Sequence, residues 1–323
     1  MPPRWRIESV DTTTSTNDDL RRAAEAGEAE GLVITAARQS AGRGRQGRVW
    51  ESPEGNLYCS ALLRPSHMPQ RAGLYSFVAA LAVRDVVAGC LQCSPPPCGE
   101  GLGEGGVRLG ALIQILKQLP QHHPPLPNPP RKGEGTLPLI TLKWPNDVLV
   151  HGKKISGILL EVAGDALIVG IGVNVAHYPE NALYPATSLR EVLEGVESST
   201  LLAGLMRQHQ VKNERGLVNR RACVDQPPPS PPASGGDALG AMLDLLLTRL
   251  GYWHDVMESQ GFGPIRSAWL EQAQTGPLTV RLPQETLNGS FAGLDENGAL
   301  RLRLEDGAER VISTGDVVLP PKD

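Results

Sequence analysis

Glycine and arginine alternate in one short segment of the sequence, from Gly42 to Arg48. Glycines let the backbone turn sharply and bring its N–H groups close to an anion. Arginine adds planar, fork-shaped donors that fit carboxylates and phosphates. The segment therefore predicts an anion-binding loop. Loops that contact nucleic-acid phosphates have the same composition, and the segment matches neither of the standard nucleotide-binding glycine patterns.

A second run, Lys143–Asp147, reads Lys-Trp-Pro-Asn-Asp. A strand-like stretch delivers the lysine and proline then forces a turn, so an amide and a carboxylate stand at that turn. The arrangement suits the edge of a site for phosphate, metal or ribose, although an ordinary turn has the same composition. Two weaker runs follow. Lys154 precedes a glycine that allows close approach of a ligand, and Asn174 ends a Gly-Ile-Gly-Val-Asn run that a strand bulge would also explain.

Helices and strands must position these motifs. Apolar spacing predicts helices over 15–27, 74–89, 243–257 and 264–273, with Ser15 or Thr16 capping the first. Short apolar runs predict strands at 32–37, 57–63, 139–144, 148–150, 155–162 and 167–175. The last four of these strands are expected to be consecutive in one sheet.

The end of the chain has a different period. From Gly276 onward apolar residues alternate, and Asn-Gly at 297–298 and Asp-Gly at 306–307 are signals for hairpin turns. We expect a small barrel-like β domain here. Two stretches rich in proline and glycine, 92–138 and 212–236, cannot build a packed core and are expected to be disordered insertions, the first with a short helix at 109–119.

Bulk composition limits the classes of protein. The chain has 323 residues, 40% of them hydrophobic, which suits one large domain or a large and a small one. A net charge of −4 gives no reason to expect general affinity for nucleic acid or membranes. No stretch approaches a membrane span in length, so a cytoplasmic protein is expected. The five cysteines fit reduced thiols. Three of them, with two histidines, match no standard zinc spacing: Cys90, Cys93, Cys98, His122 and His123.

The order of the motifs is more specific than any one of them. It runs from Ser15-Thr16-Asn17 through Gln39, the Gly42–Arg48 loop, Trp50 and Lys143–Asp147 to Lys154 and Asn174. This series resembles that of the biotin–protein ligases, also called biotin–[acetyl-CoA carboxylase] ligases, over most of the chain apart from the two insertions. The resemblance implies an α+β catalytic domain over 1–274, with a mixed sheet flanked by helices as in class II aminoacyl-tRNA synthetases. It also implies an SH3-like C-terminal domain over 275–323.

The activity implied by the resemblance has two steps. ATP, with Mg²⁺, activates biotin to biotinyl-5′-AMP, and a lysine of a biotin carboxyl carrier protein then takes the biotin as an amide and releases AMP. The carrier would belong to acetyl-CoA carboxylase or a related carboxylase, and the ligase would be a monomer or a homodimer. Many bacterial relatives carry an N-terminal DNA-binding module. The Ser15 motif stands too near the start to leave room for one, so we expect a ligase that is not a repressor.

The resemblance also implies roles for individual residues. The biotin site would comprise Ser15, Thr16, Asn17, Gln39, Arg43, Gly44, Arg45 and Lys154. The nucleotide site would comprise Arg48, Trp50, Lys143, Asn146 and Asn174. The catalytic residues would be Lys154, Arg45, Arg43 and Asp147. Among these, Asp147 is the candidate acceptor for the proton of the attacking amine, and the metal ligands are left open.

The first step would join two anions, so it needs alignment and charge neutralisation rather than a base. The loop that closes over the adenylate would keep water out, and it should be mobile until it orders around a polyanion. Two alternatives remain at this point. A lipoate–protein ligase shares the fold and the adenylate chemistry. A nucleic-acid or protein-interaction module would use the basic loop and the β domain, and it would bind in a salt-sensitive way without ATP turnover.

Overall fold

The structure is a computed structural model that describes residues 3–66, 68–92, 139–180, 182, 184–195 and 236–319. Both expected insertions lie outside these residues except at their outermost positions. The same holds for the helix expected at 109–119 and for the candidate zinc ligands Cys93, Cys98, His122 and His123. The remaining candidate, Cys90, is a buried residue of a core helix.

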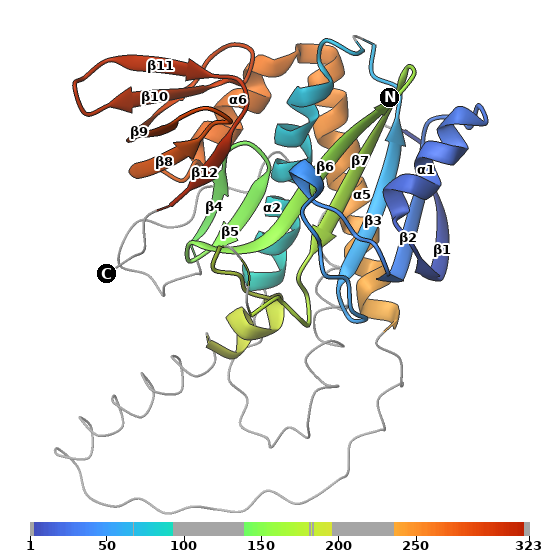
Figure 1. Ribbon diagram of the computed structural model, residues 1–323. Coiled ribbons are helices and arrows are strands. Elements are labelled where there is room, and N and C mark those ends of the chain that lie inside the picture. Colours follow the sequence, from blue (N-terminus) through green and yellow to red (C-terminus); the bar gives the residue numbers. More distant parts are fainter. Residues whose placement is uncertain are drawn as a thin grey trace, which may run out of the picture.

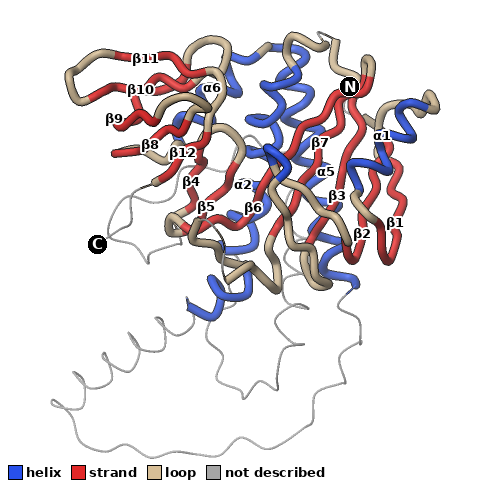
Figure 2. The backbone as a smooth tube through the Cα atoms, in the orientation of Figure 1, coloured by secondary structure: helices blue, strands red, loops and turns tan. Residues whose placement is uncertain are grey.

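A seven-stranded mixed sheet forms the larger part of the molecule (Figures 1 and 2). Its strands are β1 (Arg6–Thr13), β2 (Leu32–Gln39), β3 (Leu57–Leu63), β4 (Ile140–Lys143), β5 (Asp147–Val150), β6 (Lys153–Ala163) and β7 (Ala166–Val173). The order is β1-β2-β3-β7-β6-β5-β4, and only the pairing of β1 with β2 is parallel. The four strands expected to be consecutive are neighbours, which confirms that prediction.

The two faces of this sheet are covered unequally. Helices α2 (Tyr75–Gln92) and α5 (Gly236–Gln260) lie together on one face (Figure 1). The apolar side predicted for the second of these helices is buried there, in the main core. Helix α1 (Thr16–Glu25) covers part of the other face, where Leu20 packs on Leu62 and Ile168 in a smaller core. The rest of that second face is left for other contacts.

Helix α2 corrects the expectation that no stretch is long enough to span a membrane. The segment Ala72–Leu91 is long and apolar enough by length and composition, but 94% of the window is buried inside the protein. Its apolar residues surround the helix because it packs between the sheet and α5. Helix α2 therefore belongs to the core.

The first part of the chain differs from expectation in two details. Ser15 stands at the N-cap position of α1, as predicted, but its side chain makes no capping hydrogen bond. Strand β1 was not predicted. Seven of its eight residues are exposed, so it lacks the alternation of buried and exposed residues from which strands are predicted.

The end of the chain forms a second, antiparallel sheet. Helix α6 (Phe262–Glu271) precedes this sheet, whose strands are β8 (Pro277–Arg281), β9 (Thr286–Leu294), β10 (Leu300–Leu304), β11 (Glu309–Ile312) and β12 (Asp316–Val318). Earlier in the chain, two short 3-10 helices lie in the basic loop and before α2: η1 (Arg45–Gly47) and η2 (Ala72–Leu74). The order is β11-β10-β9-β8-β12. Both predicted hairpin turns join adjacent strands, with positive φ at Gly298 and Gly307. Over residues 277–319 no hydrogen bonds close the sheet between β11 and β12, so the expected barrel is open there.

The two sheets are joined by specific contacts beside the β4–β5 turn. The indole of Trp144 donates a hydrogen bond of 3.0 Å to the carbonyl of Gly298 in the β9–β10 turn. A side chain at Gly298 would collide with Phe77 and Leu74, so this turn packs directly on η2 and α2. The C-terminal sheet is therefore held against the edge of the large sheet that carries the Lys143–Asp147 motif.

Candidate active site

A cavity of about 510 Å³ opens on the side of the large sheet that faces α1 and the basic loop. All the residues singled out from the sequence line it: Ser15, Thr16, Asn17, Gln39, Arg43, Gly44, Arg45, Arg48, Trp50, Lys143, Asn146, Asp147, Lys154 and Asn174. They come from the start of α1, the end of β2, the loop after it, the β4–β5 turn, β6 and the end of β7. The motifs are scattered over 160 residues of sequence but converge in one place.

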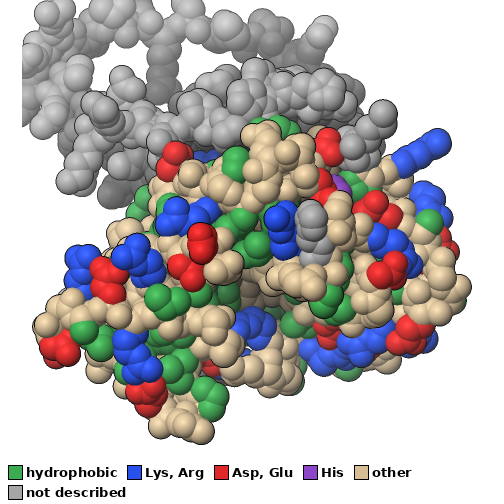
Figure 3. All heavy atoms as spheres, turned by 90° about the horizontal axis from the view of Figure 1, so that it is seen from above, with side chains coloured by type: hydrophobic (Ala, Val, Ile, Leu, Met, Phe, Trp, Pro, Cys, Tyr) green, Lys and Arg blue, Asp and Glu red, His purple; other side chains and the backbone are tan. Residues whose placement is uncertain are grey.

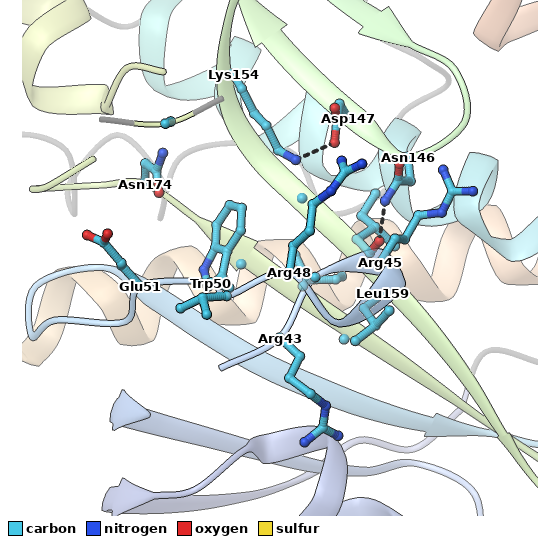
Figure 4. A pocket seen from close by; sticks show the side chains of 18 of the residues that line it. Arg43, Arg45, Arg48, Trp50, Glu51, Asn146, Asp147, Lys154, Leu159 and Asn174 are labelled. Atoms are coloured by element: carbon cyan, nitrogen blue, oxygen red, sulfur yellow. Dashed lines mark hydrogen bonds and ion pairs between the residues drawn. The ribbon is translucent and has the colours of Figure 1, made fainter. Parts of the chain in front are cut away.

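A buried charge cluster lies at one end of the cavity (Figure 4). The carboxylate of Asp147, 6% exposed, is 2.6 Å from the ammonium of Lys154 and 2.9 Å from that of Lys143. Lys143 also donates to the carbonyl of Val317 at 3.1 Å and lies over the ring of Tyr184 at 4.4 Å. Two cations thus share one carboxylate, which leaves a net positive charge at this end of the cavity.

The charge state of Asp147 follows from these neighbours. Burial raises the pKa of its carboxyl group, but the two nearby ammonium groups outweigh burial and lower the pKa to about 2. Asp147 is therefore a carboxylate near neutral pH and a weak proton acceptor. The role of general base is not favoured by this geometry, whereas holding Lys143 and Lys154 in place is.

The basic loop has a defined conformation. Gly44 N donates to Arg48 O at 2.7 Å and Trp50 N donates to Gly42 O at 2.9 Å, while Gln46 has a positive φ at the tip. Gly42 is required by packing, because a Cβ there would lie 2.5 Å from the carbonyl oxygen of Trp50. The loop therefore doubles back and returns the chain to the cavity at Trp50.

Acidic groups neutralise the arginines of this loop. The guanidinium of Arg43 makes two hydrogen bonds to Asp18, of 2.7 and 2.6 Å, and these lower the pKa of that carboxyl group. Arg43 also lies 3.6 Å from Glu161, and Figure 4 shows it pointing away from the Lys154–Asp147 pair. Its predicted contact with biotin would therefore require it to leave Asp18.

The two other arginines contact the C-terminal sheet. Arg48 forms an ion pair with Asp316, and Arg45 donates to the carbonyl of Gly315 at 3.4 Å. Burial lowers the pKa of Arg45, which remains a cation because guanidinium is not deprotonated in proteins. Asp316 and Val317 of β12 thus line the cavity. No local pattern in the sequence indicates this, because the contact with Arg48 spans 268 residues and the contact with Lys143 spans 174.

The floor of the cavity is made of strand glycines. A Cβ at Gly172 would lie 2.7 Å from the indole of Trp50, and one at Gly157 would lie 3.0 Å from it. The indole therefore rests flat on β6 and β7, with the Lys154 ammonium 5.4 Å from its ring centre. Glycine is needed at these positions because a side chain would displace the aromatic ring.

The side chains of both predicted asparagines donate hydrogen bonds to backbone carbonyl groups. Asn146 donates to the carbonyl of Ile158 at 2.6 Å, and Asn174 donates to that of Thr187 at 3.1 Å. Another asparagine was missed: the side-chain oxygen of Asn56 accepts three successive backbone N–H groups at residues 175–177, each at 2.9 Å. This buried amide fixes the segment that follows Asn174, and its Gly-Asn context could only have suggested a turn.

Comparison with known proteins places this fold and cavity in a class. Residues 7–176 match the biotin/lipoate A/B protein ligase family, and residues 277–319 match the biotin protein ligase C terminal domain. The first match covers more than half of the chain, so the chain belongs to the biotin/lipoate A/B protein ligase family. This confirms the family expected from the order of the motifs.

Individual relatives show which members of this family the chain resembles. A biotin–[acetyl-CoA-carboxylase] ligase of Paracoccus denitrificans is 30% identical over 94% of this chain and 97% of its own length. One of Mycobacterium tuberculosis is 32% identical over 64% of each chain. The structure of a biotin protein ligase from Aquifex aeolicus in complex with biotin and ATP has a TM-score of 0.60, covers 98% of this chain and 99% of that chain, and is 23% identical, which shows a common fold.

Proposed function

We propose that this chain joins biotin and ATP into biotinyl-5′-AMP, releasing pyrophosphate, and then transfers the biotin to one lysine of a biotin carboxyl carrier protein, releasing AMP. The observation that carries the proposal is the convergence of five cationic side chains on one cavity: Arg43, Arg45, Arg48, Lys143 and Lys154. Its volume of about 510 Å³ lies in the range of about 300–1,000 Å³ that is usual for small-molecule sites. The family and the relatives agree with this chemistry.

The arrangement suits a reaction between two anions. The carboxylate of biotin and the triphosphate of ATP are both negatively charged and repel each other. Cations that are already held in place where the negative charge accumulates aid the attack on the α-phosphorus. Lys154 and Lys143 are held in that way by Asp147. We assign Lys154 to the junction of the biotin carboxylate and the α-phosphate, and Lys143 to the neighbouring phosphate charge.

The two ends of the cavity differ in chemistry. Hydroxyl and amide groups gather at the start of α1, around Ser15, Thr16 and Asn17, and we assign this end to the fused rings of biotin. Trp50 lies next to Lys154, and we assign its aromatic face to the adenine ring. We assign Asn146 and Asn174 to the border of the nucleotide site. Arg43, Gly44 and Arg45 close the biotin side, and Arg48 reaches toward the phosphates.

The proposed partners follow from the second step. The neutral amine of a carrier lysine attacks the acyl carbonyl of the adenylate, the C–N bond forms, and AMP leaves with the electron pair of the broken C–O bond, while the proton that the amine loses passes to water. Magnesium enters as MgATP: within the described residues no three His, Cys, Asp or Glu side chains are grouped so as to hold a metal, and Asp147 is already engaged by two lysines. We propose that the metal arrives with ATP as part of the substrate.

A single incubation tests the function. The protein is mixed with biotin, MgATP and an unmodified biotin carboxyl carrier domain, and the carrier is analysed by mass spectrometry. We expect the mass of one biotinyl group on one lysine, no gain without ATP, and no gain with lipoate in place of biotin. Protein that shows no biotin-dependent exchange of pyrophosphate into ATP would contradict the proposal, and labelling by lipoate alone would favour the lipoate–protein ligase.

The nucleic-acid alternative is not supported by the surface. Figure 3 shows acidic and basic side chains interspersed over the face that it presents, rather than a single basic patch. Phosphate-backbone binding needs clustered, uncompensated lysine and arginine.

Changing Gly172 to Ala should weaken the use of ATP. The new methyl group would lie 2.7 Å from the indole of Trp50 and push it off the sheet. Because overpacking typically costs about 1–3 kcal/mol, we expect the KM for ATP to rise about tenfold or more. Steady-state pyrophosphate exchange measures it, and Gly263→Ala in helix α6, where a Cβ meets nothing within 4 Å, is the matched control. An unchanged KM for ATP in Gly172→Ala would argue against Trp50 as the adenine platform.

A further inference from the structure

A chain of polar contacts runs from the end of β2 to the floor of the cavity. The side-chain oxygen of Gln39 accepts from the backbone N–H of Thr16 at 3.0 Å and lies 3.2 Å from the hydroxyl of the same residue. The other end of the Gln39 amide donates to Ser52 at 3.0 Å. A backbone N–H can only donate, so the orientation of the Gln39 amide is fixed.

Ser60 connects this chain to Asn17. Ser60 lies in the middle of β3, opposite Gly170 of β7, and is fully buried. Its hydroxyl oxygen is 2.7 Å from the hydroxyl of Thr16 and 2.6 Å from the near end of the Asn17 amide. That amide lies on Gly170, where a Cβ would be 2.2 Å from it, and its far end is buried without a hydrogen-bond partner among the described residues.

The number of protons decides which end of Asn17 faces the cavity. Each hydroxyl has one proton to donate. If Thr16 donates to Gln39, then Ser60 donates to Thr16, and Asn17 must present its nitrogen to Ser60 and its oxygen to the cavity. All three contacts are then hydrogen bonds.

The opposite arrangement is less favourable. If Ser60 donates to an Asn17 oxygen, Thr16 must donate to Ser60. The 3.2 Å contact between Thr16 and Gln39 then joins two oxygens with no proton between them. The NH₂ group of Asn17 would also stay buried without an acceptor, and unpaired buried donors are costly. The first arrangement makes three hydrogen bonds where the second makes two.

We propose that Ser60 is a positioning residue for substrate selection, which turns the Asn17 amide so that its carbonyl oxygen faces the cavity and accepts an N–H group from the substrate. The inference rests on the proposed function, because the cyclic urea of biotin supplies such N–H groups. The dithiolane ring of lipoate has none, so with lipoate the buried Asn17 oxygen would stay unpaired. Ser60 itself touches no substrate and acts through Asn17.

Kinetics of biotin-dependent and lipoate-dependent pyrophosphate exchange test the proposal. Ser60→Ala frees the Asn17 amide to turn, so we expect the KM for biotin to rise about tenfold, the KM for ATP to stay within twofold, and the preference for biotin over lipoate to fall. Ser76→Ala is the matched control, since Ser76 is also buried but donates to Gly73 far from the cavity. It should leave both KM values and the preference unchanged.

The outcomes separate the two proposals. Wild-type protein that uses biotin, together with a Ser60→Ala variant of unchanged KM for biotin, would overturn the role of Ser60 and leave the proposed function standing. Equal rises in both KM values would point to general distortion and would also overturn it. Wild-type protein without biotin-dependent exchange would overturn both proposals. If Ser60→Ala does not fold, Ser60→Cys carries the test, because the thiol is a weaker hydrogen-bonding group and should raise only the KM for biotin.

Discussion

Replacing Lys154 by Met should slow biotin-dependent pyrophosphate exchange by about 10²–10³-fold, the usual cost of removing one preorganised group that stabilises charge in a transition state. The Lys154 ammonium is 2.6 Å from Asp147 and its side chain is 25% exposed, toward the cavity (Figure 4). In the variant Asp147 would keep only Lys143 as its partner. The net positive charge at this end of the cavity would be lost, although methionine keeps the volume.

The neighbouring lysine provides the control. Lys153 is the preceding residue of β6, but its side chain is 47% exposed and pairs with Glu191. Exposed ion pairs contribute about 0–1 kcal/mol. Lys153→Met should therefore leave the exchange rate and the melting temperature nearly unchanged. Equal losses in the two variants would show that Lys154 has no special role.

Replacing Asp85 by Asn should destabilise the protein by about 3–5 kcal/mol, the usual cost of breaking a buried ion pair from one side. Asp85 of α2 is buried and accepts hydrogen bonds from two side chains of α5, Arg249 at 2.8 Å and Trp253 at 3.0 Å. Arg84 is 3.1 Å away. An amide would remove the negative charge that faces these two buried guanidinium groups between the helices.

Thermal and denaturant unfolding measure this loss. Asp244→Asn, on an exposed position of α5, is the matched control and should change stability by less than about 0.5 kcal/mol. Asp85 is remote from the cavity, so Asp85→Asn should keep the wild-type KM values below its melting temperature. A variant as stable as the wild type would show that the helices are held by apolar packing alone.

The sequence predicted the elements whose signals are local. The apolar side of α5 and the alternating strands after Gly276 follow directly from the spacing of their residues, and both are present. Strand β1 was missed because its pairing with β2, rather than burial, defines it. We expected the motifs to lie together in one site because their order along the chain resembles that of a known family. Four expectations remain predictions: that the ligase is not a repressor, that it is a monomer or a homodimer, that the catalytic domain ends at residue 274, and that the basic loop is mobile.

Contacts between distant parts of the chain could not be predicted. The pairing of Arg43 with Asp18 neutralises part of the basic loop, but it could not be predicted because acidic residues at the start of a helix are common for other reasons. Asp316 gives no sign of its proximity to Arg48 until both sheets are placed. Ser60 reads as one small residue in an apolar strand, and only its neighbours show what it does.

The contacts of β12 set an order of events during biosynthesis. The wall that Asp316 and Val317 contribute to the cavity leaves the ribosome 268 residues after Arg48 and 174 residues after Lys143. Domains generally fold as they are synthesised, from the N-terminus onward. A nascent ligase therefore holds these cationic side chains without their β12 partners, and the enclosure around a water-sensitive adenylate is completed only after β12 has been translated.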